Sequence, residues 1–198
     1  MFKTSARAAL FLLVSGTALI AQESVYTDID LEEKCQITEQ SEEGGFIAFL
    51  CDGLPGYPVR VAEDDLRQFT QFGDVASEDL RSQTFAPWNR VNSVVEWRLI
   101  DGRPYATILR WFIENLNPVT GSVDPAHLGQ VLVISTVATS EDGDSCMVGM
   151  VDALANEEAN LLARSVADTL AQDFDCTSDE LRYHGGRGPL SPEPPANR

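Results

Sequence analysis

Two cysteines placed symmetrically about a turn constrain this chain more than any other feature. The stretch CQITEQSEEGGFIAFLC runs from Cys35 to Cys51 and has the polar, glycine-containing segment SEEGG at its centre. A three-residue loop at 42–44 puts Gly44 where hairpins need a left-handed residue, and this register sets Cys35 directly opposite Cys51. Such partners have Cβ atoms about 4.5–5.5 Å apart, which a disulfide can bridge after slight adjustment. The segment therefore predicts a disulfide-stapled hairpin.

The other two cysteines, Cys146 and Cys176, predict a second disulfide. Cys146 opens the apolar run CMVGMVDA, which is typical of a strand. The segment that follows has apolar residues at every fourth position, as an amphipathic helix does, with alanines beside them. These residues are Leu162, Val166, Leu170 and Phe174. A strand leading out and a helix leading back bring Cys176 near Cys146, and an even cysteine count is typical of exported proteins.

The N-terminus has the parts of a secretory signal peptide. Lys3 and Arg7 precede an apolar run that is shorter than the roughly 20 residues of a membrane span. We expect residues 1–21 to be this signal, with cleavage after Ala18 or Ala21, and the mature protein to be periplasmic or secreted. The alternative is an uncleaved N-terminal anchor. No later segment predicts a membrane span.

The chain is strongly acidic. It has 31 Asp and Glu against 14 Lys and Arg, a formal net charge of −17. Such a charge repels nucleic acid and anionic lipid, so we expect neither as a partner.

Residues 22–176 predict a single α+β domain. Residues 58–63 are typical of a strand and 63–74 of a short helix, while VVEWRL and YATILRWFIE flank Asp101-Gly102, a strong two-residue turn signal. Strands at 130–138 and 146–153 follow a long loop at 115–129. We expect a two-layer fold, an antiparallel β-meander with the C-terminal helix packed on one face. Residues 177–198 have few apolar side chains and predict a disordered tail.

No motif in the chain predicts a reaction. H-E-x-x-H, P-loop, G-x-G-x-x-G and C-x-x-C patterns are all missing. His127 is best explained as a loop residue and His184 as part of the tail. The acidic SEDGDS segment lacks the spacing of a calcium loop. We therefore predict no catalytic residue, no metal site and no cofactor.

One group of residues departs from the acidic average. Arginines cluster with the tryptophans between residues 81 and 111. A two-residue turn at Asp101-Gly102 would place Arg98 opposite Tyr105, with the apolar side chains of the other face covered by the helix. We predict a binding face from this group: Arg90, Glu96, Arg98, Arg110 and Trp111, with Arg110 at the margin of the helix-covered core. Arginine among aromatic residues is typical of surfaces that recognise carboxylates or protein partners.

The alternative explanation of that group is structural. Its arginines would then pair with neighbouring acids, and its tryptophans would fill the core.

The order of blocks YTDIDLEEKC, EWRLIDGRPYATILRWF, VDALANEEAN and FDC resembles an uncharacterised family of small exported bacterial proteins. The resemblance implies that the four cysteines form a common framework, and it brings no assigned activity. We expect an exported, non-enzymatic domain that binds another envelope protein or a small anionic ligand. The alternatives are a hydrolase-like envelope enzyme using carboxylates that the sequence does not single out, and a structural envelope protein.

Overall fold

The computed structural model describes residues 22–75, 83–140 and 143–195. The predicted signal peptide, both predicted cleavage positions and Arg81 lie outside these ranges.

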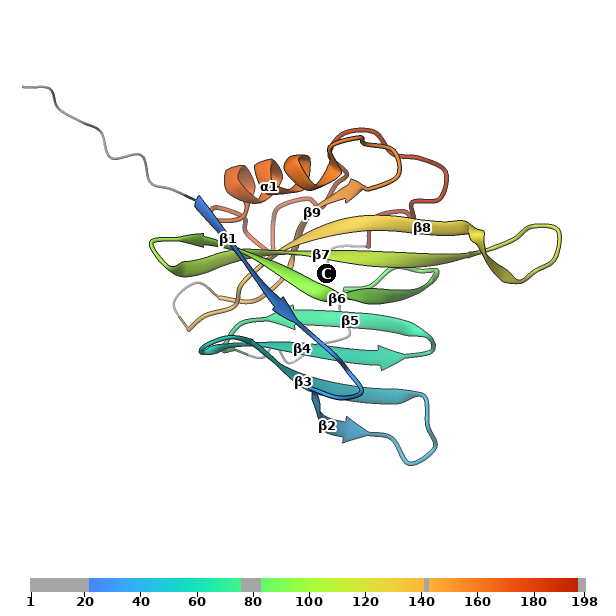
Figure 1. Cartoon of the computed structure of the whole chain (residues 1–198), viewed down its shortest axis with the longest axis horizontal. Coiled ribbons are helices and arrows are strands. Elements are labelled where there is room, and N and C mark those ends of the chain that lie inside the picture. Colours follow the sequence, from blue (N-terminus) through green and yellow to red (C-terminus); the bar gives the residue numbers. More distant parts are fainter. Residues whose placement is uncertain (1–21, 76–82, 141–142, 196–198) are drawn as a thin grey trace, which may run out of the picture.

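The described residues form two antiparallel sheets and one helix (Figure 1). The larger sheet has the order β1-β6-β7-β8-β9, with bounds β1 (Gln22–Asp28), β6 (Trp88–Ile100), β7 (Arg103–Leu116), β8 (Val123–Thr136) and β9 (Met147–Asp152). The smaller sheet has the order β2-β3-β4-β5, with bounds β2 (Gln36–Gln40), β3 (Phe46–Leu54), β4 (Tyr57–Asp64) and β5 (Arg67–Phe72). Helix α1 spans Ala159–Leu170.

The predicted α+β class is confirmed, but the layers differ from the prediction. Apolar side chains of the smaller sheet pack against one face of the larger sheet and form the main core with it. Helix α1 covers the other face, where Ala163 and Ala167 lie in a buried cluster with Ile108 and Ile134. The order is therefore sheet, sheet, helix (Figure 1). The single meander is replaced by two sheets because the N-terminal third of the domain forms four strands of its own.

Both predicted disulfides are present. Cys35 and Cys51 have Cα atoms 4.3 Å apart, and the neighbouring pair Gln36–Leu50 has the predicted register. A bulge between Ile37 and Glu39 then shifts the register, so the loop is longer than predicted. The second disulfide joins Cys146 to Cys176. Two disulfides are typical of proteins from oxidising compartments.

The predicted helix at 63–74 is wrong, because this segment forms the turn and second strand of a hairpin. Strand β4 turns into β5 at Asp65 and Leu66, which both have positive φ, 50° and 60°. Phe69 and Phe72 are three residues apart, a spacing that also fits a helix face. In the sheet they belong to two different buried clusters, Phe72 to the main core and Phe69 to a smaller one.

The β6–β7 hairpin has the predicted Asp101-Gly102 turn but not the predicted register. Ile100 pairs with Arg103 as expected. A bulge then places Ala106, rather than Tyr105, opposite Arg98. Because side chains alternate between the faces of a strand, this one-residue shift changes which β7 residues share a face with Arg98.

The predicted disordered tail is also corrected. Residues 177–195 are described and pack on the domain. Met150 on β9 donates its N–H to the carbonyl of Arg182 at 3.1 Å and accepts the N–H of His184 at 2.8 Å. Leu181 is buried in the main core. The segment has few apolar residues, but hydrogen bonds to the edge of the sheet hold it in place.

Candidate functional site

The predicted binding residues do not form one exposed face. Arg98 and Glu96 point toward helix α1, where each forms an ion pair. Arg98 donates from Nε and Nη2 to the two carboxylate oxygens of Asp168, both at 2.8 Å. Arg164 on the helix donates from Nε to Glu96 Oε1 at 2.6 Å. The helix covers the face that the sequence predicted to be open, so these two residues are structural contacts in the fold.

Trp111 is likewise placed in the core. Its side chain is 0% exposed and meets the ring of Phe85 edge to face, with 5.4 Å between centroids. The prediction of an exposed Trp111 is therefore wrong. The second sheet, which the sequence analysis did not foresee, covers the face on which this tryptophan lies.

Arg90 and Arg110 remain accessible on the part of the larger sheet beyond the helix. Phe112 pairs with Arg90 on β6 and with Gln130 on β8, so these three side chains share one face. The Arg90 guanidinium lies over the Phe112 ring, 4.3 Å from its centroid. Arg110 lies two residues before Phe112 on the same face and donates from Nη1 to Gln130 Oε1 at 2.9 Å. We call Arg90, Arg110, Phe112, Glu114 and Gln130 the arginine surface.

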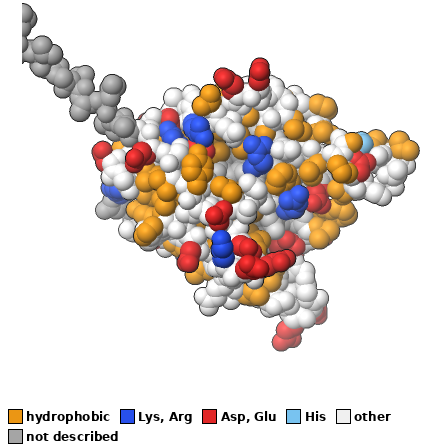
Figure 2. All heavy atoms as spheres, viewed as in Figure 1, with side chains coloured by type: hydrophobic (Ala, Val, Ile, Leu, Met, Phe, Trp, Pro, Cys, Tyr) orange, Lys and Arg blue, Asp and Glu red, His pale blue; other side chains and the backbone are white. Residues whose placement is uncertain are grey.

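The two arginines of this surface have few anionic partners. Arg90 has Glu114 at 3.6 Å between Nε and Oε1, a loose pair in which the arginine side chain is half exposed. Arg110 makes no ion pair with any described carboxylate. Partial burial lowers the pKa of Arg110, but a guanidinium stays protonated at neutral pH. A half-buried cation without a counter-charge is unusual in so acidic a chain. Figure 2 shows the basic side chains of one face scattered among hydrophobic, uncharged and acidic ones.

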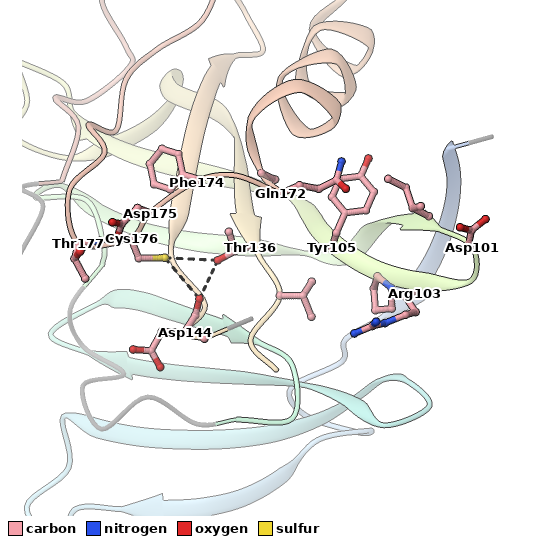
Figure 3. A pocket seen from close by; sticks show the side chains of 15 residues that line it. Asp101, Arg103, Tyr105, Thr136, Asp144, Gln172, Phe174, Asp175, Cys176 and Thr177 are labelled. Atoms are coloured by element: carbon pink, nitrogen blue, oxygen red, sulfur yellow. Dashed lines mark hydrogen bonds between the residues drawn. The ribbon is translucent and has the colours of Figure 1, made fainter. Parts of the chain in front are cut away.

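A cleft of about 630 Å³ lies at one end of the larger sheet (Figure 3). It is bordered by the β6–β7 turn, the end of β8 and the segment 171–177 that follows α1. Its apolar lining residues are Ile100, Pro104, Val137, Ala171 and Phe174. Cys176, Thr136 and Asp144 lie at one end and Asp101 at the other. The sequence analysis missed this cleft, because its walls come from segments that only the fold brings together.

Among the described residues, each carboxylate whose pKa is shifted has a pKa below its ordinary value. They are Asp124, Asp152, Asp175 and Glu193. Burial alone would raise the pKa of Asp152, but hydrogen bonds from Ser191, Gly188 and the backbone hold it below its ordinary value. A general acid in hydrolysis needs the opposite displacement. These groups are therefore suited to holding structure together.

Both histidines lie against other residues of the fold. His127 Nδ1 lies 2.8 Å from Asp124 Oδ1 at the start of β8. The His184 ring lies close to Gly149 of β9, and its backbone N–H donates to the carbonyl of Met150. Within the ranges that the structure describes, no group of three or more His, Cys, Asp or Glu could hold a metal ion. No helix in those ranges is long and apolar enough to span a bilayer.

No family model, curated protein or solved structure matches this chain.

Proposed function

We propose that this chain is an exported, non-enzymatic binding domain, periplasmic or secreted, whose arginine surface contacts an acidic segment of another envelope protein. Arg110 carries the proposal, because it is partly desolvated and lacks a carboxylate partner among the described residues. A partner carboxylate would supply that missing charge, and an arginine can bind it through two parallel hydrogen bonds. The same chemistry would accept a small carboxylate ligand.

Phe112 and Arg90 add an aromatic ring stacked with a second guanidinium to this surface. The ring of Phe112 is partly buried and lies under the Arg90 guanidinium. Aromatic residues and arginines are enriched among the side chains that contribute most to protein–protein binding. An acidic partner segment with an apolar side chain beside its carboxylate fits this pair of contacts. The two disulfides support the location that we propose.

A photo-crosslinking side chain placed at Gln130 in the exporting cell tests the proposal. We expect a discrete crosslinked protein from this position, and its yield should fall several-fold when Arg110→Ala is added, since losing an arginine anchor commonly costs more than about 1 kcal/mol of binding. The same group at Leu161, which is exposed on α1, is the positional control. Arg182→Ala, an exposed arginine on the tail, controls for the loss of one positive charge.

Equal crosslinking from Gln130 and Leu161, or a yield that Arg110→Ala leaves unchanged, would contradict the proposal. A crosslink lost equally in Arg182→Ala would show that total charge matters and the surface does not.

A further inference from the structure

We propose that Cys146–Cys176 is an exchangeable disulfide, and that the cleft beside it admits the thiolate of a dithiol reductant of the thiol–disulfide oxidoreductase class. The inference does not depend on the arginine surface. It rests on where the two sulfurs lie and on the hydroxyl group next to them.

The two cysteines of this disulfide differ in access. Cys146 is 7% exposed and lies just before β9, whereas Cys176 is partly exposed and lines the cleft (Figure 3). Exchange requires a thiolate to reach one sulfur in line with the bond that breaks. The cleft offers such a path to the Cys176 sulfur, so Cys176 is the sulfur attacked and Cys146 the sulfur that leaves.

The Cys35–Cys51 disulfide in the same chain shows how a disulfide away from the cleft is placed. Cys51 is 2% exposed and belongs to the core between the two sheets, and Cys35 packs against that core. Neither cysteine lines the cleft. Both disulfides join a buried cysteine to a partly exposed one, and of the four cysteines Cys176 is the one that lines the cleft.

A hydroxyl group stands beside both sulfurs of the proposed site. Thr136 Oγ1 lies 3.8 Å from Cys146 Sγ and 3.9 Å from Cys176 Sγ. Its position is fixed because it also accepts the backbone N–H of Cys146 at 2.9 Å. A hydroxyl there can turn to donate to whichever sulfur becomes a thiolate. Stabilising the departing thiolate lowers the pKa of the leaving thiol, and thiols of lower pKa leave faster.

The chemistry is a two-electron exchange. A thiolate of the reductant attacks Cys176 Sγ and forms a mixed disulfide, and the electron pair of the broken S–S bond goes to Cys146 Sγ. The second thiol of the reductant, after losing its proton, attacks the mixed disulfide and releases the Cys176 thiolate. The reductant ends as its own disulfide, and the two protons it gave up reside on Cys146 and Cys176.

Reduction would change the cleft and leave the fold in place. Helix α1 is held on the sheet by its own buried residues, among them Ala163 and Ala167, which lie in a cluster apart from the disulfide. The segment 171–177, which forms one wall of the cleft, is joined to the end of the sheet by Cys176. Ala171 and Phe174 of this wall stay packed in the cluster beneath the helix, so breaking the disulfide frees only the Cys176 end of the wall and changes the shape of the cleft there.

Timed reduction of the folded, full-length protein with dithiothreitol tests this. Free thiols are alkylated at each time point and assigned by peptide mass spectrometry, while circular dichroism follows the fold. We expect Cys146 and Cys176 to be labelled at least about tenfold faster than Cys35 and Cys51, because exchange follows access to the sulfur. The native spectrum should persist when only the first pair has reacted.

A variant that narrows the cleft makes the test specific. Gln172 lines the cleft and is exposed, so Gln172→Trp should slow labelling of the first pair several-fold and leave the second pair unchanged. Leu161→Trp, on the exposed side of α1, is the matched control and should change neither rate. Labelling of Cys35 and Cys51 at an equal or higher rate overturns the proposal. So does labelling of all four cysteines only as the native spectrum is lost, or an identical rate in Gln172→Trp and wild type.

Discussion

The guanidinium of Arg98 on β6 and the carboxylate of Asp168 on α1 form a two-pronged ion pair, with Nε–Oδ1 and Nη2–Oδ2 both 2.8 Å. Their side chains are 7% and 20% exposed, so the pair is largely desolvated. Tyr105 donates its hydroxyl to Asp168 Oδ1 at 2.6 Å and completes the contact. The pair connects the helix to strand β6 of the larger sheet.

Breaking this pair should destabilise the fold strongly. We expect Arg98→Ala to lower the free energy of unfolding by about 3 kcal/mol, because it leaves the largely desolvated carboxylate of Asp168 without its counter-charge. Asp168→Ala should cost a similar amount, and the double variant less than the sum of the two. Urea unfolding monitored by circular dichroism measures all three.

Arg187→Ala is the matched control for an exposed pair. Arg187 pairs with Glu193, whose side chain is 82% exposed, and exposed pairs of this kind contribute little to stability. Equal losses in Arg98→Ala and Arg187→Ala would mean that burial of the Arg98 pair does not matter.

Replacing Arg110, unlike replacing Arg98, should not lower the free energy of unfolding. Arg110→Met removes a partly desolvated cation that has no described anionic partner, and keeps most of the side-chain volume. We expect the free energy of unfolding to stay within about 0.5 kcal/mol of wild type or to rise, as at other surface positions or at buried charges replaced by apolar residues. Thermal melting of Arg110→Met and Arg98→Met side by side measures the contrast. A drop for Arg110→Met as large as that for Arg98→Met would indicate a structural role.

The C-terminal segment should be required for stability. A chain ending after Thr177 loses Gly188 and Ser191, which each donate to Asp152 Oδ2 at 2.7 Å. Hydrogen bonds to a charged group contribute about 1.5–3 kcal/mol each, so we expect a loss of at least about 3 kcal/mol in the free energy of unfolding. A chain ending after Pro195 keeps every described contact of the tail and is the control. Equal urea midpoints for the two truncated chains would show that the tail is dispensable.

We expect protonation of Asp152 to make the folded protein less stable in acid. Burial tends to raise its pKa, but the hydrogen bonds from Ser191, Gly188, Leu154 and Ala155 outweigh burial and hold the pKa below its ordinary value of 3.8. A carboxylate whose pKa is lower in the folded than in the unfolded state adds stability above the unfolded value and loses it as pH falls through the folded value.

The wild type should therefore lose more stability than Asp152→Asn between pH 5 and the acid side of that pKa. Urea midpoints measured across this range check the difference. Parallel curves for the two proteins would show that Asp152 ionisation does not contribute.

The parts of the fold that sequence could predict depend on neighbours along the chain. The turn between Cys35 and Cys51 lies within a single hairpin, so symmetry about SEEGG was enough to place them opposite each other. The four-residue repeat of Leu162 and Val166 reflects one face of one helix. In both, the contacts that matter join residues at most 16 apart.

Two of the wrong predictions concern the partner that a segment pairs with, whether that partner is near or far along the chain. Phe69 and Phe72 have a helical spacing, and only pairing with β4 makes their segment a strand. The tail has a composition typical of disorder, and only the exposed edge of β9 and the Asp152 carboxylate hold it. Neither partner can be recognised in the segment itself.

The sequence by itself determined which residues are unusual, and the tertiary structure decided what each of them does. Arg98 and Arg110 are the same residue type in the same predicted surface. One bulge at Tyr105 and the position of α1 bury Arg98 against Asp168, while Arg110 lies beyond the helix and donates a hydrogen bond to Gln130. The reason is electrostatic. The role of a guanidinium depends on its burial and on the nearest carboxylate, and both are set by segments about 70 residues away in the chain for Arg98.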